Sequence, residues 1–157
     1  MRRALTYCIL AAALGTQAVA APRHSWNQIR YVGGTVPVKP SRYDWDTTLT
    51  VNPDSIVLVF TPPTVFKPGF TLRLKPSQLT SLSFGLTAWR RVAEVSGAVL
   101  PAKAPSLLGM LPDWVSVGIV YRTEDGKPGA VLLETGFNGQ ILRTLKQVTG
   151  KPVEGFP

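Results

Sequence analysis

The chain has 157 residues, of which 45% are hydrophobic, so it can form one domain of ordinary size with a packed core. It carries 17 Lys and Arg against 9 Asp and Glu, a formal net charge of +8. These basic residues are dispersed along the chain, whereas nucleic-acid-binding proteins usually concentrate them on one face or helix, so we expect no nucleic-acid partner. The single cysteine, Cys8, lies near the start, and the rest of the chain therefore has no thiol for catalysis or for a thiolate metal site.

Residues 1–20 have the pattern of a secretory signal peptide. Two arginines open the segment, a short apolar run follows, and an A-V-A motif stands directly before Ala21, as at an A-x-A cleavage site. The apolar run is too short to span a bilayer comfortably. We therefore expect export to the periplasm or beyond, by a Sec or a Tat route, and removal of the leader lowers the net charge to +6 because Arg2 and Arg3 leave with it.

The first half of the mature chain is predicted to be mainly extended. Residues 21–28 are expected to be a flexible start, and a short extended segment follows that breaks at Gly33-Gly34. Residues 45–51 alternate between apolar and polar, the N-P-D-S sequence at 52–55 is a turn signal, and the apolar run 56–60 is typical of a strand buried on both faces. Residues 61–69 contain three prolines and are expected to form a loop.

Two further strands are predicted at 70–75 and 78–84, joined by a turn at Pro76-Ser77. Residues 89–95 fit either a strand or a single helical turn, and we favour the strand. Residues 97–113 have no clear period and are rich in Leu, Ala and Pro, which predicts a long apolar loop.

The best-specified part of the sequence is its end. Strands are predicted at 115–122 and 130–135, with a hairpin turn at Asp125-Gly126 between them. Asn138 is a candidate N-cap for a helix that ends at Gly150, before a tail at 153–157. The apolar stripe of that helix consists of Ile141, Leu142, Leu145 and Val148.

Short strands followed by one helix indicate an α+β, mainly β domain, with an antiparallel sheet of about seven strands curled over the C-terminal helix. Three stretches also carry a resemblance: L-T-V-N-P-D-S-I-V-L-V-F, L-R-L-K-P-S-Q-L-T-S-L-S-F-G and G-I-V-Y-R-T-E-D-G-K-P-G-A-V-L-L-E-T with the helix after it. Together they resemble the pleckstrin-homology-like (PH-like) barrel of secreted bacterial proteins. The resemblance covers residues 29–152 and implies a small β-barrel capped by the helix.

Side chains suited to catalysis are few. His24 is the only histidine and lies in the segment expected to be flexible, so it is a poor candidate for a general base. Asp44 and Asp46 flank Trp45 and could share a face, although solvated loop acids are the simpler interpretation. Without a histidine partner the serines have no activating base, and no cofactor or metal motif is present in the sequence. We therefore expect a protein that is not an enzyme and that uses no cofactor.

Two kinds of binding are expected instead. PH-like barrels leave a groove between one sheet edge and the C-terminal helix, where an extended peptide could add as a strand. The residues proposed for this partner-binding edge are Gln78, Thr80, Leu82 and Phe84, although the loop 97–113 could simply cover the edge.

The alternative is peripheral binding to an anionic membrane surface. The basic residues proposed to contact it are Lys39, Arg42, Arg90 and Arg91, and the apolar loop residues that could insert are Leu107, Leu108, Met110 and Leu111. The spacing V-K-P-S-R departs from the first-loop pattern of the lipid-binding relatives, and the four apolar residues could instead cover the open end of the barrel.

Overall fold

The computed structural model describes residues 23–60, 69–97 and 116–155. The strands are β1 (His24–Gly34), β2 (Thr47–Val51), β3 (Ile56–Phe60), β4 (Phe70–Leu74), β5 (Leu79–Phe84), β6 (Ser116–Arg122), β7 (Pro128–Glu134) and β8 (Val153–Glu154). The helices are α1 (Gly85–Ser96) and α2 (Asn138–Thr149), with a 3-10 turn, η1, at Pro76–Gln78.

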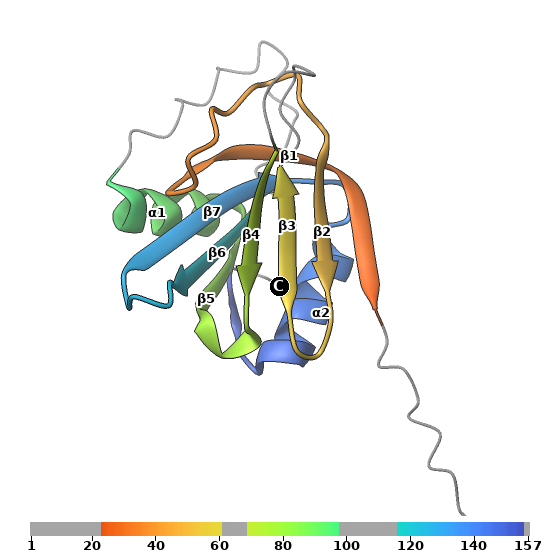
Figure 1. Cartoon of the computed structure of the whole chain (residues 1–157), viewed down its shortest axis with the longest axis vertical. Coiled ribbons are helices and arrows are strands. Elements are labelled where there is room, and N and C mark those ends of the chain that lie inside the picture. The colour runs from red at the N-terminus through yellow and green to blue at the C-terminus, as the bar shows by residue number, and fades with distance from the viewer. Residues whose placement is uncertain (1–22, 61–68, 98–115, 156–157) are drawn as a thin grey trace, which may run out of the picture.

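All eight strands belong to one sheet in the order β4-β3-β2-β1-β7-β6-β5-β8. The long strand β1 joins the two halves of this sheet: its first part pairs with β2 up to Ile29, and its second part pairs with β7 from Arg30. A register shift between Trp26 and Ile29 includes Gln28, whose φ is 57°, and this bulge lets β1 bend. In Figure 1, β2, β3 and β4 stand in front, β5, β6 and β7 cross behind them, and β1 runs from one group to the other.

The main core fills the space between the two halves of the sheet. Its fully buried members from the strands include Ile29, Leu49, Leu58 and Ile119. Helix α2 closes this core with three fully buried residues, Ile141, Leu142 and Leu145. The apolar stripe predicted for the helix is therefore the face that it buries, since a helix stripe at this spacing must pack against another element.

Helix α1 covers the opposite face of β6 and β7, where a second apolar cluster lies. The members of this cluster are Val32, Ala88, Val92, Val120, Ala130 and Leu132. The helix approaches β6 closely at Gly118, where a Cβ would lie 3.0 Å from the Cα of Ala88. Trp89 fixes the contact from the side, because its Nε1 donates to Ser116 Oγ at 2.9 Å. Strand β6 is consequently buried on both faces from Ser116 to Tyr121.

Several sequence predictions are confirmed. The domain is mainly β, with a C-terminal helix that ends at Gly150 in the left-handed conformation, φ 69°. The hairpin between β6 and β7 turns at Gly126, whose φ is 77°. Strand β3 lies where the apolar run predicted it, β4 lies where the alternation predicted it, and β1 ends at Gly34, where the break was expected.

Other predictions are wrong. The sheet is open, with β4 and β8 at its two ends, rather than the closed barrel that the resemblance implies, and it has eight strands where about seven were expected. Residues 89–95 belong to helix α1 and not to a strand. Of the segment expected to be flexible, residues 24–28 belong to strand β1, where His24, Ser25 and Trp26 pair with β2. Strand β3 has an outward face, since Val59 is 38% exposed.

A smaller correction concerns the start of α2. The N-cap is Phe137, and Asn138 is the first helical residue, with its Nδ2 donating to the Thr135 carbonyl at 3.3 Å. Beyond Gly97, the expected apolar loop lies outside the described residues.

Candidate functional site

Strand β5 is the element from which the candidate site is built. It pairs antiparallel with β6 on one side and parallel with β8 on the other. The pairing with β8 is short, since only Leu82 and Ser83 have partners there, Val153 and Glu154. The six-residue β5 is thus an edge that accepts a strand, and the segment after α2 occupies part of it.

The four residues proposed for the partner-binding edge do not form one accessible row. Leu82 is fully buried and Phe84 is partly buried against the main core. Thr80 is exposed, and it lies at a register shift between Leu79 and Ser81 that interrupts the regular alternation of side chains along the strand. Gln78 lies in η1, where its Nε2 donates to the Arg122 carbonyl at 3.0 Å. The backbone of β5 at 82–83 pairs with β8, and side chains from neighbouring elements surround this pairing.

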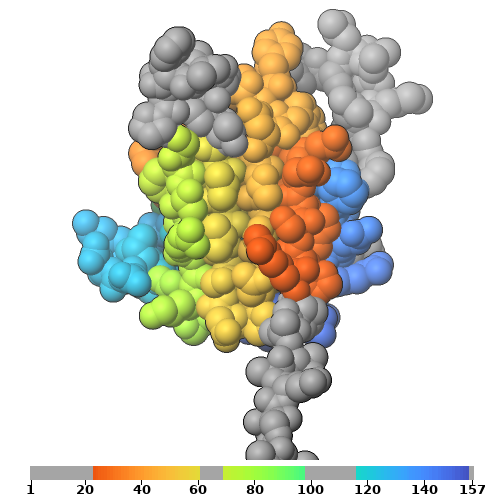
Figure 2. All heavy atoms as spheres, turned by 45° about the vertical axis from the view of Figure 1, so that its right-hand side comes forward, coloured from red at the N-terminus to blue at the C-terminus, as the bar shows by residue number. Residues whose placement is uncertain are grey.

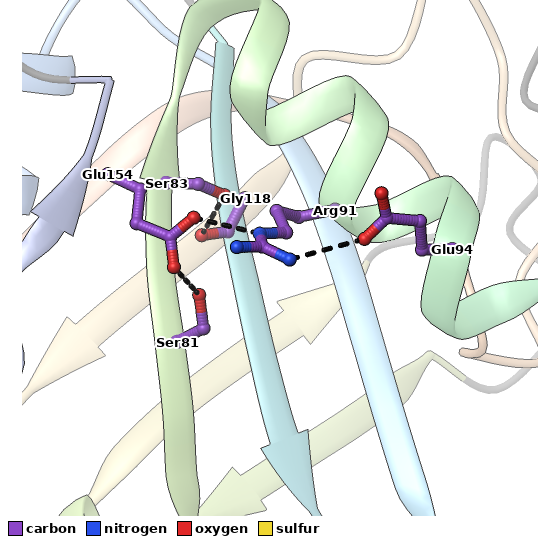
Figure 3. Close-up of polar contacts among 6 residues, drawn as sticks. All are labelled: Ser81, Ser83, Arg91, Glu94, Gly118 and Glu154. Atoms are coloured by element: carbon purple, nitrogen blue, oxygen red, sulfur yellow. Dashed lines mark hydrogen bonds and ion pairs between the residues drawn. The ribbon is translucent and has the colours of Figure 1, made fainter.

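The side chains around this pairing form a polar cluster centred on Glu154 (Figure 3). Arg91 Nε donates to Glu154 Oε2 at 2.8 Å, and Ser81 Oγ donates to Glu154 Oε1 at 3.4 Å. Arg91 also donates through Nη1 to Glu94 Oε2 at 3.3 Å, within the same helix. The hydrogen bond from the guanidinium to the Glu154 carboxylate raises the pKa of Arg91 above its ordinary value. Helix α1 and strand β5 thus each supply one donor to a single carboxylate.

The residues beside Glu154 fit the edge in a different way. Val153 packs partly buried against the main core, opposite Leu82. Gly155 has φ 76°, and a Cβ there would lie 2.8 Å from Thr87 Oγ1 and 3.0 Å from the Phe84 carbonyl oxygen. Three consecutive positions therefore hold an apolar residue that packs on the core, a carboxylate that accepts hydrogen bonds, and a glycine whose backbone is left-handed.

The basic residues proposed for an anionic surface divide between two elements. Lys39 and Arg42 are exposed in the loop between β1 and β2, whereas Arg90 and Arg91 lie on α1. Arg91 forms ion pairs with Glu94 and Glu154. The four apolar residues of the second proposal, Leu107, Leu108, Met110 and Leu111, lie outside the described residues.

The loop between β1 and β2 has a feature that the sequence analysis did not use: two exposed aromatic rings. Tyr43 is 81% exposed and Trp45 is 45% exposed. The guanidinium of Arg30 lies 5.7 Å from the centre of the Trp45 ring, and the same guanidinium donates through Nε to Glu134 Oε2 at 3.0 Å. Trp45 is thereby held at the surface beside an ion pair between β1 and β7.

Two hollows lie in the described surface. One, of about 20 Å³, lies beneath the β1–β2 loop next to Tyr31, Asp44 and Asp46, and has room for roughly one water molecule. The other, of about 270 Å³, is an open cleft between the start of β1 and α2, lined in part by His24 and Thr144. The His24 ring stacks on Trp26 at 5.9 Å.

One face of the sheet can be followed in a space-filling view. In Figure 2 the coloured part of the outer face of β1 to β4 is closely filled and carries no deep hollow. Over the ranges 23–60, 69–97 and 116–155, no three His, Cys, Asp or Glu residues gather as metal ligands would. Neither α1 nor α2 is long and apolar enough to cross a membrane, and the same holds for every helix described.

Fold and site together define a mainly β domain whose sheet takes up a short parallel strand at β5. A scan against protein-family models matches none, and a search of curated proteins finds no significant match. The residues around β5 are therefore the basis on which a function can be proposed.

Proposed function

We propose that this protein is a non-enzymatic, exported interaction module that binds an extended segment of a partner protein along β5. The observation that carries the proposal is the pairing of β5 with β8, a strand of only two residues. An edge that holds a short strand of the protein itself has the backbone geometry to hold a strand of another, which is how strand addition works.

The shortness of β8 favours exchange. It pairs with two of the six residues of β5, and Val153 and Glu154 are both only partly buried. Segments with few backbone pairs and little buried apolar surface open at a small fraction of the free energy of global unfolding. A partner strand that replaced residues 151–155 and ran farther along β5 would gain additional pairs, so it could compete with β8.

The sequence resemblance supports the same site. In PH-like barrels the groove for an extended peptide lies between one sheet edge and the C-terminal helix, and here β8 follows α2 directly. We propose that the open sheet with α2 against its core is a variant of that barrel. The leader pattern at 1–20 supports delivery of the domain outside the cytoplasm.

A peptide-display selection on the mature protein tests the function. Peptides selected from a random library are titrated into isotope-labelled protein, and the backbone amide shifts are mapped by NMR. We expect the largest shifts in β5, β8 and the facing side of α1. Selected peptides whose shifts map to another part of the domain, or a selection that yields no peptide at all, would contradict strand addition at β5.

A second function, binding to an anionic membrane surface, is favoured by the loop between β1 and β2. Lys39 and Arg42 are exposed there beside the exposed rings of Tyr43 and Trp45. Aromatic rings with a polar edge suit the headgroup region, and basic residues are attracted to anionic lipid. Asp44 lies in the same loop and opposes that attraction.

Co-sedimentation with phosphatidylglycerol vesicles distinguishes this second function from the first. Binding at low salt should fall when salt screens the charges, and a Lys39→Gln, Arg42→Gln double variant should bind less. An Arg143→Gln, Lys146→Gln double variant is the matched control, because it removes two exposed charges from α2 and leaves the loop intact. Absence of binding by the unmodified protein at low salt would remove this function.

A further inference from the structure

We propose that Arg91 is the specificity residue of this peptide site, and that the site selects an apolar residue, a carboxylate and a glycine in consecutive positions. The segment Val153-Glu154-Gly155 presents that pattern and acts as a built-in competitor for the ligand. This inference rests on the proposed function, since it names the ligand class of the same edge.

The carboxylate position is the most sharply defined. Both oxygens of Glu154 accept a hydrogen bond, one from Arg91 Nε at 2.8 Å and the other from Ser81 Oγ at 3.4 Å. One donor comes from α1 and the other from β5, the strand that pairs with β8 (Figure 3). Hydrogen bonds from a guanidinium to a carboxylate are stronger than neutral ones, so a glutamine in place of the glutamate would be held less well.

The positions before and after the carboxylate also restrict which residues the site can hold. The residue opposite Leu82 must be apolar, because Val153 packs there against the main core. The residue after the carboxylate must be glycine, because the backbone is left-handed at Gly155 and Thr87 fills the space that a Cβ would need. The required order of side chains follows from the parallel direction of β8 along β5.

The competitor is effective because it is tethered. A segment linked to its own site competes at an effective concentration in the millimolar range, so a free peptide with the same contacts binds the unmodified protein weakly. A substitution that weakens the binding of residues 153–155 and leaves β5 and Arg91 unchanged should therefore make the site accessible to a free peptide. The Glu154→Gln substitution does this, since it removes the carboxylate from the segment and leaves Arg91 in place.

The test uses the full mature chain and two amidated, fluorescein-labelled peptides. One has the sequence Gly-Lys-Pro-Val-Glu-Gly of residues 150–155, and the other has Gln in place of the Glu. Fluorescence anisotropy should give about threefold to fivefold tighter binding of the Glu peptide to the Glu154→Gln variant than to the unmodified protein. The same variant should prefer the Glu peptide over the Gln peptide by a similar factor.

Two further variants identify the receptor. Adding Arg91→Gln to Glu154→Gln should abolish the preference for the Glu peptide, whereas adding Arg90→Gln should leave it unchanged, because Arg90 carries the same charge on the same helix. A preference that survives Arg91→Gln overturns the role of Arg91. If neither peptide binds while library peptides still map to β5, the ligand pattern is wrong and the proposed function stands. If library peptides also fail to map to β5, both fail.

Hydrogen exchange provides a readout that does not depend on the variants. The amides that pair β8 with β5 in the unmodified protein should exchange faster than the core amides of β6, through local opening. If these amides exchange as slowly as the core amides of β6, then β8 is a fixed part of the fold and cannot act as a displaceable competitor.

Discussion

The close approach of α1 to β6 can be tested by adding one methyl group at Gly118. A Cβ at this position would lie 2.6 Å from Ser83 Oγ and 3.0 Å from both the Cα and the Cβ of Ala88. The serine side chain can rotate away, but the Ala88 Cα belongs to the helix backbone. Gly118→Ala therefore forces the whole helix to move away from the sheet by a few tenths of an ångström, and it loosens the apolar cluster beneath it.

The expected cost follows from two opposing terms. Forcing an extra methyl group into a packed interface typically costs about 1 to 3 kcal/mol. Replacing Gly by Ala where the backbone is unstrained returns about 0.4 to 1 kcal/mol through the unfolded chain. We expect a net loss of about 1 to 2 kcal/mol in the free energy of unfolding, which for a domain of this size lowers Tm by roughly 2 to 8 °C.

Chemical denaturation followed by Trp fluorescence measures this loss, with Gly136→Ala as the matched control. A Cβ at Gly136 would meet nothing within 4 Å, so that variant should stay within about 0.5 kcal/mol of the unmodified protein. A double variant with Ala88→Gly should recover part of the loss, with a coupling energy above about 0.5 kcal/mol. If Gly118→Ala proved as stable as Gly136→Ala, then α1 would not lie on β6, and the strand first expected at 89–95 would regain its place.

Three other predictions test the rest of the fold. Leu145→Asp places an unpaired charge in the closed core and should cost at least about 3 kcal/mol, enough to unfold much of the protein, whereas Lys146→Asp on the exposed side should cost little in the same denaturation assay. Gly34→Ala should cost about 3 kcal/mol or more, because φ is 146° and a Cβ would lie 2.1 Å from the Ala130 carbonyl oxygen; the loss is read from Tm. Burial raises the pKa of Tyr31 to about 12, so the folded protein keeps a proton that the unfolded chain loses near pH 10. The free energy of unfolding should therefore fall as the pH rises above 10, by about 1 kcal/mol at pH 11. Urea denaturation at pH 9 and pH 11 should give a smaller fall for Tyr31→Phe.

The parts of the fold that the sequence predicted correctly are those fixed by local chemistry. The β6–β7 turn needs a left-handed residue, and Gly126 supplies it with φ 77°. The apolar stripe of α2 runs from Ile141 to Val148 and the helix ends at Gly150, so both the period and the end of the helix can be read within one short window. The β2–β3 turn is likewise local, since the Asn52 N–H donates to the Ser55 carbonyl at 2.8 Å.

Helix α1 was missed because its pattern was read from too short a window. From Trp89 onward the residues alternate well enough for a strand. Read from Gly85, the buried residues are Gly85, Ala88 and Val92, which are spaced by three and four and lie on one face of a helix. The buried face is narrow because the helix meets the sheet at Gly118, which has no side chain. That contact joins residues far apart in the sequence, so local periodicity could not reveal it.

The candidate site was misread for a related reason. Alternation placed Thr80, Leu82 and Phe84 on one side of a strand, but the register shift at Leu79 and Ser81 breaks that alternation. A bulge leaves no mark in polarity when the residues around it are Thr and Ser. Binding of a partner strand at β5 therefore stays a prediction, and of the side chains named for it Leu82 is fully buried.

The pairing of β8 with β5 could not be predicted from periodicity in the sequence. Two residues, Val153 and Glu154, are too few to define a period, and in the sequence they look like an ordinary tail after Pro152. Their position depends on the pairing of Glu154 with Arg91, 63 residues earlier in the chain. Neither residue carries a local sign of that pairing, because a charged residue on a surface helix and another in a tail are both common. An edge strand can be predicted from its own sequence, but whether it is free, covered or held by a competitor depends on contacts between segments that are distant in the sequence.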